Sequence, residues 1–124
     1  MGHDHLPYRA RIGDEVSADR PIRFGKPSDL WELPISWSLD DFPHFEYFRG
    51  GGLRSAPDVL ANWLEDFSYL LEEESRGVLT YTLHPFVMGR GHRMRMLTSL
   101  LASLRELGAE FVTAEQAIAL FKDE

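Results

Sequence analysis

The stretch VLTYTLHP, residues 78–85, is the part of the chain that decides its fold. It is compact and apolar, and its β-branched and aromatic side chains are typical of a buried strand. Pro85 disfavours helical backbone in the residue before it and therefore marks the end of the strand. We predict a strand over residues 78–84 that presents His84 where the strand gives way to a loop.

Helices are predicted on both sides of this strand. Before it, start signals at Ser55 and Pro57 precede apolar residues at helical spacing, and Gly77 ends the pattern. After it, apolar residues at helical spacing predict a second helix over about residues 92–107, and Gly108 is a typical C-terminal stop. The strand thus lies between two amphipathic helices.

The rest of the chain extends this alternation. Residues 1–29 show no periodic apolar pattern, and we expect an irregular segment there. Short strands are predicted over residues 30–39 and 110–114, and Thr113 with Gln116 forms a capping box that opens a last helix. About three strands and three helices in this order predict an α/β fold with a parallel sheet. Three parallel strands make a poor sheet by themselves, which indicates that strands are missing.

Bulk composition excludes several classes of protein. The 124 residues fit one domain, over residues 1–124, with 44% hydrophobic and 27% charged residues. A formal net charge of −7 makes nucleic acid an unfavourable partner. There is no cysteine for a disulfide or a thiolate metal site. The sequence shows neither a signal peptide nor an apolar run long enough to cross a membrane, so we expect a cytoplasmic protein.

Two candidate groups follow the ends of predicted strands. His84 ends one strand, and histidine is the side chain best suited to exchange a proton near neutral pH. Trp37, Asp40 and Asp41 lie at the end of the strand over residues 30–39, where a carboxylate could orient and tune a histidine beside an aromatic wall. The structural alternatives are a histidine that only caps its strand and aspartates that only bond backbone amides in a turn.

Basic residues and a histidine pair give two further candidates. In FVMGRGHR, residues 86–93, Arg90 and Arg93 precede or begin a helix and could contact a carboxylate or an oxyanion, although an ordinary solvated basic cluster explains them equally well. HDH at residues 3–5 could chelate a metal transiently, but no third ligand is specified.

Four stretches together resemble a known family. They are LPISWSLDDFPHFEY at 33–47, the tryptophan-bearing helix, LTYTLHPFVMGRGHR at 79–93 and FVTAEQAIALF at 111–121. In order and spacing they are similar to the last portion of the polysaccharide deacetylase family, in its peptidoglycan-deacetylase-like and allantoinase-like branch. The resemblance implies the C-terminal part of a distorted (β/α) barrel that hydrolyses amide or cyclic amide bonds with a divalent metal, zinc being the expected ion.

The resemblance also implies roles for individual residues. His84 matches the histidine that protonates the departing amine, and Asp41 or Asp40 matches the carboxylate that tunes it. The expected substrate contacts are two aromatic walls and two basic side chains: Trp37, Phe86, Arg90 and Arg93. The implied substrate is a small carbohydrate-like or ureide molecule.

The metal-binding half of the family pattern has no counterpart in this chain. The family's aspartate pair and its His-x-x-x-His motif are both absent from the sequence. We therefore expect this chain alone to bind no metal and to be inactive, because a general acid does not by itself generate the nucleophile. The expected partners are a missing N-terminal half or further copies of the chain. The alternative is a shortened, non-catalytic relative that binds a ligand or a protein partner.

Overall fold

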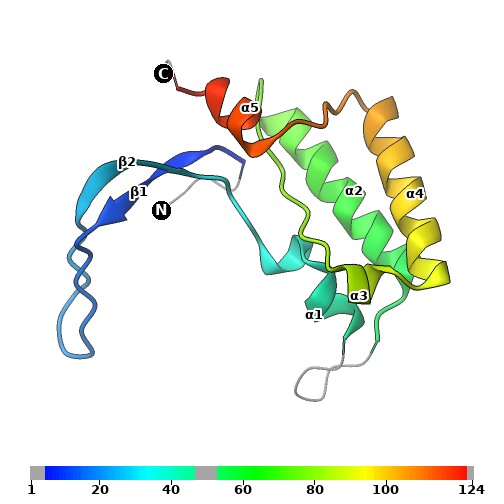
Figure 1. The fold of residues 1–124 in the computed structure, drawn as a ribbon, viewed down its shortest axis with the longest axis horizontal. Helices are drawn as coiled ribbons and strands as arrows, with labels where there is room; N and C mark the ends of the chain where they lie inside the picture. Colours follow the sequence, from blue (N-terminus) through cyan, green and yellow to red (C-terminus); the bar gives the residue numbers. More distant parts are fainter. Residues whose placement is uncertain (1–4, 47–52, 123–124) are drawn as a thin grey trace.

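The computed structural model describes residues 5–46 and 53–122, which form a helical body and a projecting two-stranded arm (Figure 1). The arm pairs β1 (Tyr8–Ile12) with β2 (Lys26–Glu32) in antiparallel orientation. An isolated bridge between Glu15 and Arg23 extends this pairing beyond the two strands. The chain therefore folds back on itself before it enters the body.

The arm differs from the irregular segment that the sequence predicts over residues 1–29. Neither strand contains a fully buried residue, because both faces of the arm are open to solvent. A strand without a buried face needs no alternation of apolar and polar side chains. The sequence of the arm therefore carries no two-residue period from which its strands could be recognised.

Two long helices form the centre of the body. These are α2 (Ala56–Glu73) and α4 (Gly91–Glu106), and they confirm the two predicted amphipathic helices. They pack against each other and supply most of the core (Figure 1). Their buried apolar side chains are Ala56, Val59, Trp63, Phe67 and Leu70 of α2 and Met96, Leu100 and Leu104 of α4. Within the described residues, no helix is both long and apolar enough to cross a membrane.

Short helices connect these elements. They are the 3-10 helix η1 (Trp37–Leu39), α1 (Asp41–Phe45), α3 (Pro85–Met88) and α5 (Ala114–Ala119). The predicted capping box opens α5, since Thr113 accepts a hydrogen bond from the backbone of Gln116 and the Gln116 side chain accepts one from the backbone of Thr113. The sequence did not predict α1 and α3, which begin directly after the two candidate strand ends.

The predicted parallel sheet does not form within the described residues. Their only sheet is the antiparallel pair β1 and β2, and residues 110–113 form no strand. Residues 78–84 are extended, but they meet the region of residues 39–41 through one parallel bridge, between Thr82 and Asp40. A strand requires a neighbour along its length, and these segments have none. The chain thus combines a helical body with one small open two-stranded sheet.

Two adjacent leucines of α4 test this description of the core. Leu100 is 1% exposed and Leu101 is 42% exposed. We expect Leu100→Ala to lower the free energy of unfolding by about 2–5 kcal/mol, because it removes buried methyl groups and leaves a cavity. Leu101→Ala is the matched control and should change it by less than about 0.5 kcal/mol. Urea unfolding of the two variants checks this, and equal losses would contradict the packing of α4.

Candidate functional site

His84 lies where the extended segment over residues 78–84 passes into α3. It is the N-cap residue of α3, and its carbonyl oxygen accepts hydrogen bonds from the backbone N–H groups of Val87 and Met88. Pro85 follows at the first helical position, where a missing N–H group costs nothing. The predicted placement of His84 at the end of an extended segment agrees with the structure, although that segment is not a full strand.

Asp41 is the direct partner of His84. It is the first residue of α1, and its side chain is 0% exposed. Its Oδ1 lies 2.7 Å from His84 Nδ1, and its Oδ2 accepts the backbone N–H of His84 at 2.9 Å. Both oxygens of a buried carboxylate are therefore used by one residue. Because an ionised carboxylate can only accept, Nδ1 carries a hydrogen and Nε2 is the nitrogen left for exchange with a substrate.

Asp40 has a different role from its neighbour. Its Oδ1 accepts the backbone N–H of Phe42 at 2.8 Å, so Asp40 is the N-cap of α1. The same oxygen lies 3.8 Å from His84 Nδ1, which is too far for a hydrogen bond but close enough for charge attraction. The structural alternative of an aspartate that bonds a backbone amide thus describes Asp40, whereas Asp41 binds the histidine.

The surroundings of His84 raise the pKa of its imidazole. The largest cause is the hydrogen bond to Asp41, and the negative charges of Asp41 and Asp40 act in the same direction. Partial burial opposes them by lowering the pKa, but the side chain remains 36% exposed. His84 therefore keeps its proton to a higher pH than an ordinary histidine, which suits a proton donor near neutral pH.

Aromatic rings flank the imidazole. The ring centroids of Phe42 and Phe86 each lie 5.8 Å from that of His84. Phe86 is exposed beside the histidine, as a wall residue would be. Trp37 is 76% exposed in η1, and no ring contact within the described residues joins it to His84. Of the two predicted aromatic walls, Phe86 therefore lies beside His84, and Trp37 does not contact its ring.

The two candidate arginines lie in different environments. Arg90 is the exposed N-cap residue of α4, so its predicted anion contact stays a prediction. Arg93 is 5% exposed, and its Nη1 and Nη2 donate to the carbonyl oxygens of Val87 and Phe45. Its guanidinium also forms an ion pair with Glu46. This burial does not support an anion-binding role for Arg93, because its charge already has partners inside the protein.

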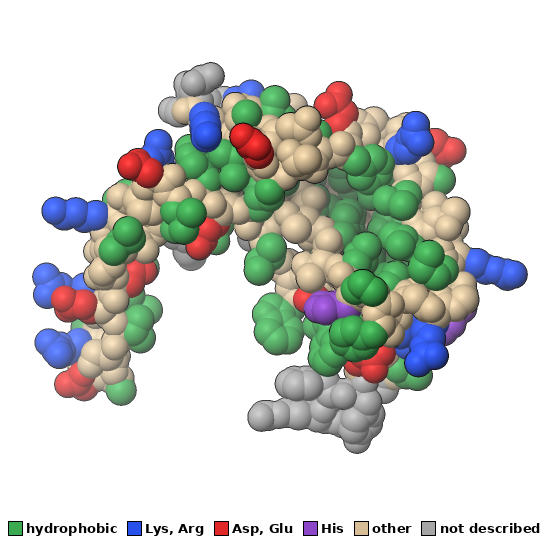
Figure 2. Space-filling view, in the orientation of Figure 1, with side chains coloured by type: hydrophobic (Ala, Val, Ile, Leu, Met, Phe, Trp, Pro, Cys, Tyr) green, Lys and Arg blue, Asp and Glu red, His purple; other side chains and the backbone are tan. Residues whose placement is uncertain are grey.

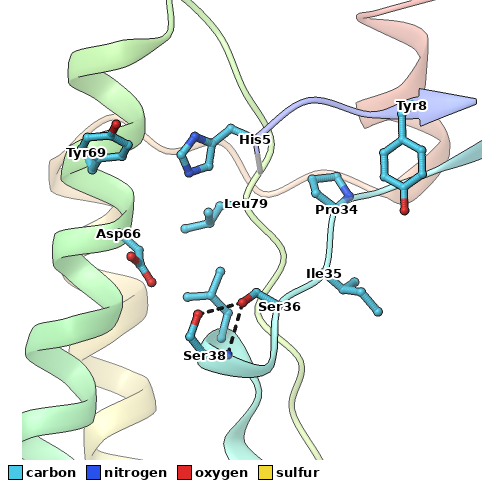
Figure 3. A pocket seen from close by; sticks show the side chains of 10 residues that line it. His5, Tyr8, Pro34, Ile35, Ser36, Ser38, Asp66, Tyr69 and Leu79 are labelled. Carbon is cyan, nitrogen blue, oxygen red and sulfur yellow. Dashed lines mark hydrogen bonds between the residues drawn. The ribbon is translucent and has the colours of Figure 1, made fainter. Parts of the chain in front are cut away.

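A separate cleft of about 410 Å³ opens between α2 and the chain that precedes η1 (Figure 3). Asp66 and Tyr69 of α2 line one side, His5 lies at one end, and Ser36 and Ser38 line the other side. No sequence pattern predicted this cleft, because its residues belong to four separate segments, over residues 5–8, 34–39, 66–69 and 79. His84 does not line it. His3 and Asp4 of the HDH stretch lie outside the described residues.

The ligand atoms of Asp40, Asp41 and His84 are already engaged in other contacts, so they do not form a free metal site. Within residues 5–46 and 53–122, Asp40, Asp41 and His84 are the only group of three side chains whose ligand atoms come within 4.8 Å of one another. The two Asp41 oxygens and His84 Nδ1 are already joined by hydrogen bonds, and Asp40 caps α1. A divalent ion at these atoms would have to displace the proton on Nδ1 and compete with the hydrogen bonds that join Asp41 to His84. We therefore assign no metal to this group.

Comparison with known proteins supports the resemblance in part. No protein-family model matches the chain. The chain is 27% identical over 128 residues to a protein of Helicobacter pylori named peptidoglycan deacetylase. The match covers 91% of this chain but 44% of that protein, so the chain spans less than half the length of this relative. These findings support a relationship to polysaccharide deacetylase-type hydrolases.

Proposed function

We propose that this chain is the proton-donating part of a carbon–nitrogen hydrolase of the polysaccharide deacetylase type, built on the C-terminal part of a distorted (β/α) barrel. One observation carries the proposal. The buried carboxylate of Asp41 binds both the backbone N–H and the imidazole Nδ1 of His84, while the imidazole stays partly exposed between two phenylalanine rings. This is the arrangement of an oriented general acid.

In the proposed reaction, the proton moves from His84 Nε2 to the departing nitrogen. Asp41 holds the Nδ1–H tautomer and stabilises the imidazolium, so the transferable proton is on Nε2. As the carbon–nitrogen bond breaks, Nε2 donates this proton to the nitrogen, which leaves as a neutral amine. The imidazole is then neutral and regains its proton from water. A positioned acid of this kind contributes roughly 10²–10⁴-fold to a rate.

The acid alone does not complete the reaction. Hydrolysis of an amide also needs a nucleophile, and in this family the resemblance assigns it to a metal-binding half. The acidic group beside His84 is engaged in hydrogen bonds, and the chain matches less than half of its relative. We therefore propose that turnover requires additional polypeptide. Acetylated sugars and cyclic ureides both remain within the proposed substrate class.

A second candidate is a non-catalytic binding module, and exposed apolar side chains favour it. Large apolar residues are exposed on both the arm and the body (Figure 2). Among those outside the arm are Ile35, Trp37, Leu83 and Phe86. Apolar surface of this kind marks sites of protein association. The partner would be a further copy of the chain or a complementary half.

The dyad predicts a specific change in the titration of His84. Asp41→Asn removes the negative charge that raises the imidazole pKa, so we expect the pKa of His84 to fall toward its usual 6.5. NMR titration of the imidazole checks this. Asp40→Asn is the matched control and should have a smaller effect, since Asp40 lies 3.8 Å from Nδ1. A larger effect of Asp40→Asn would contradict the assignment of Asp41.

The raised pKa of His84 also predicts how the free energy of unfolding depends on pH. The folded pKa is raised, so protonated His84 stabilises the fold fully below pH 6.5, and this contribution is lost as the pH rises through the folded pKa. Urea unfolding at a series of pH values should therefore show a fall in stability across this window. The fall should be smaller in Asp41→Asn.

Activity provides the direct test of the proposal. We expect no acetate release from N-acetylglucosamine oligomers by the chain alone, even with added zinc, because no nucleophile is generated. When the chain replaces the matched segment of the Helicobacter pylori relative, we expect turnover, and His84→Gln should lower kcat by roughly 10²–10⁴-fold. Undiminished turnover by the His84→Gln chimera would exclude His84 as the acid.

Association is the test of the second candidate. We expect oligomers of the isolated chain in light scattering at neutral pH, because apolar side chains are left uncovered. Phe86→Ser should reduce association if the surface beside His84 is used, and Ile12→Ser should do so if the arm is used. A monodisperse monomer for the unmodified chain would count against uncovered apolar surface as a binding site.

A further inference from the structure

The two residues of the dyad are carried by two very short helices. Asp41 is the first residue of α1, which has five residues, and His84 is the N-cap of α3, which has four. Helices of this length are not stable by themselves in water. Tertiary contacts must therefore fix their relative position, and with it the distance of 2.7 Å between Asp41 Oδ1 and His84 Nδ1.

One guanidinium group binds carbonyl oxygens of both helices. Arg93 Nη2 donates to the carbonyl of Phe45, the last residue of α1, at 3.1 Å. Arg93 Nη1 donates to the carbonyl of Val87 in α3 at 2.7 Å. The last carbonyl groups of a helix lack partners within the helix and carry partial negative charge. A cation between two such ends satisfies both and ties one helix to the other.

The surroundings of Arg93 hold this group in place. Its Cζ lies 4.8 Å from the ring centroid of Phe45, which is fully buried. Glu46, next to α1, supplies a carboxylate oxygen 3.3 Å from Nη1. The buried Nε has no hydrogen-bond partner among the described residues. The interaction therefore depends on the two Nη atoms, which a flat guanidinium directs to two separate acceptors, whereas an ammonium group carries all its donors on one nitrogen.

We propose that Arg93 is a positioning residue, which holds α1 and α3 in the arrangement that brings the Asp41 carboxylate to the His84 imidazole. The consequence for proton donation rests on the proposed function. The positioning of α1 and α3 by Arg93 does not rest on it, because it concerns a contact within the chain. Arg93 touches no reacting atom in this proposal and acts through Asp41 and His84.

The experiment measures the pKa of His84 by NMR in Arg93→Lys and Arg93→Met. If Arg93 positions the dyad, both substitutions should lower this pKa toward the value found in Asp41→Asn, because Asp41 no longer meets the imidazole. Lysine keeps the charge, but its donors share one nitrogen. It therefore cannot place two separate nitrogen donors at the carbonyls of Phe45 and Val87 as arginine does. Arg95→Met is the matched control, since Arg95 lies on the same helix with an exposed side chain, and it should leave the pKa unchanged.

Two results would overturn the proposal. The first is an unchanged His84 pKa in a folded Arg93→Lys protein that has lost only stability, which would make Arg93 a purely structural cation. The second is a drop in Glu46→Gln as large as in Arg93→Lys, because that substitution removes the ion pair and keeps both carbonyl contacts. If Arg93→Met does not fold, the lysine variant and Glu46→Gln decide. The readout requires no turnover, so loss of the proposed activity leaves it interpretable.

Discussion

The site depends on one interaction, the buried pairing of the Asp41 carboxylate with His84. A buried carboxylate without partners would be strongly unfavourable, and here both oxygens receive N–H groups from a residue 43 positions away. The backbone bond to Oδ2 fixes where the chain turns into α3, and the side-chain bond to Oδ1 fixes the direction of the imidazole. The same contact therefore closes the fold between α1 and α3 and orients the group that carries the proton.

The long helices supply a rigid support for this contact. Trp63 of α2 is fully buried, and its Nε1 donates to the carbonyl of Ser38 at 2.7 Å. His44 Nε2 lies 2.7 Å from the same oxygen, so two rings hold the turn that leads into Asp40 and Asp41. The turn is thus anchored to the core, and Asp41, which follows it, is buried where it meets His84. Irregular segments can carry a precise site when a packed scaffold holds them in this way.

Local patterns explain what could be predicted from the sequence. The periods of α2 and α4, the capping box of α5 and the end of the extended segment at His84 all depend on nearby residues. The remainder depends on tertiary contacts. Asp40 and Asp41 are adjacent and chemically identical, yet one caps a helix and the other binds the histidine. Arg90 is the exposed N-cap residue of α4, whereas Arg93 lies buried in its first turn, and sequence spacing did not show that Arg93 points inward.

The extended segment over residues 78–84 bears directly on the proposed chemistry. Residues 78–84 have the composition of a buried strand, but one parallel bridge is their only strand pairing. Their backbone would be satisfied by neighbouring strands, which in an α/β fold also present side chains at the same edge as His84. A nucleophile-generating group placed on such strands would lie at the same edge as the imidazole. In the proposed reaction, one additional polypeptide would thus supply both strand neighbours for residues 78–84 and the nucleophile, while His84 supplies the proton.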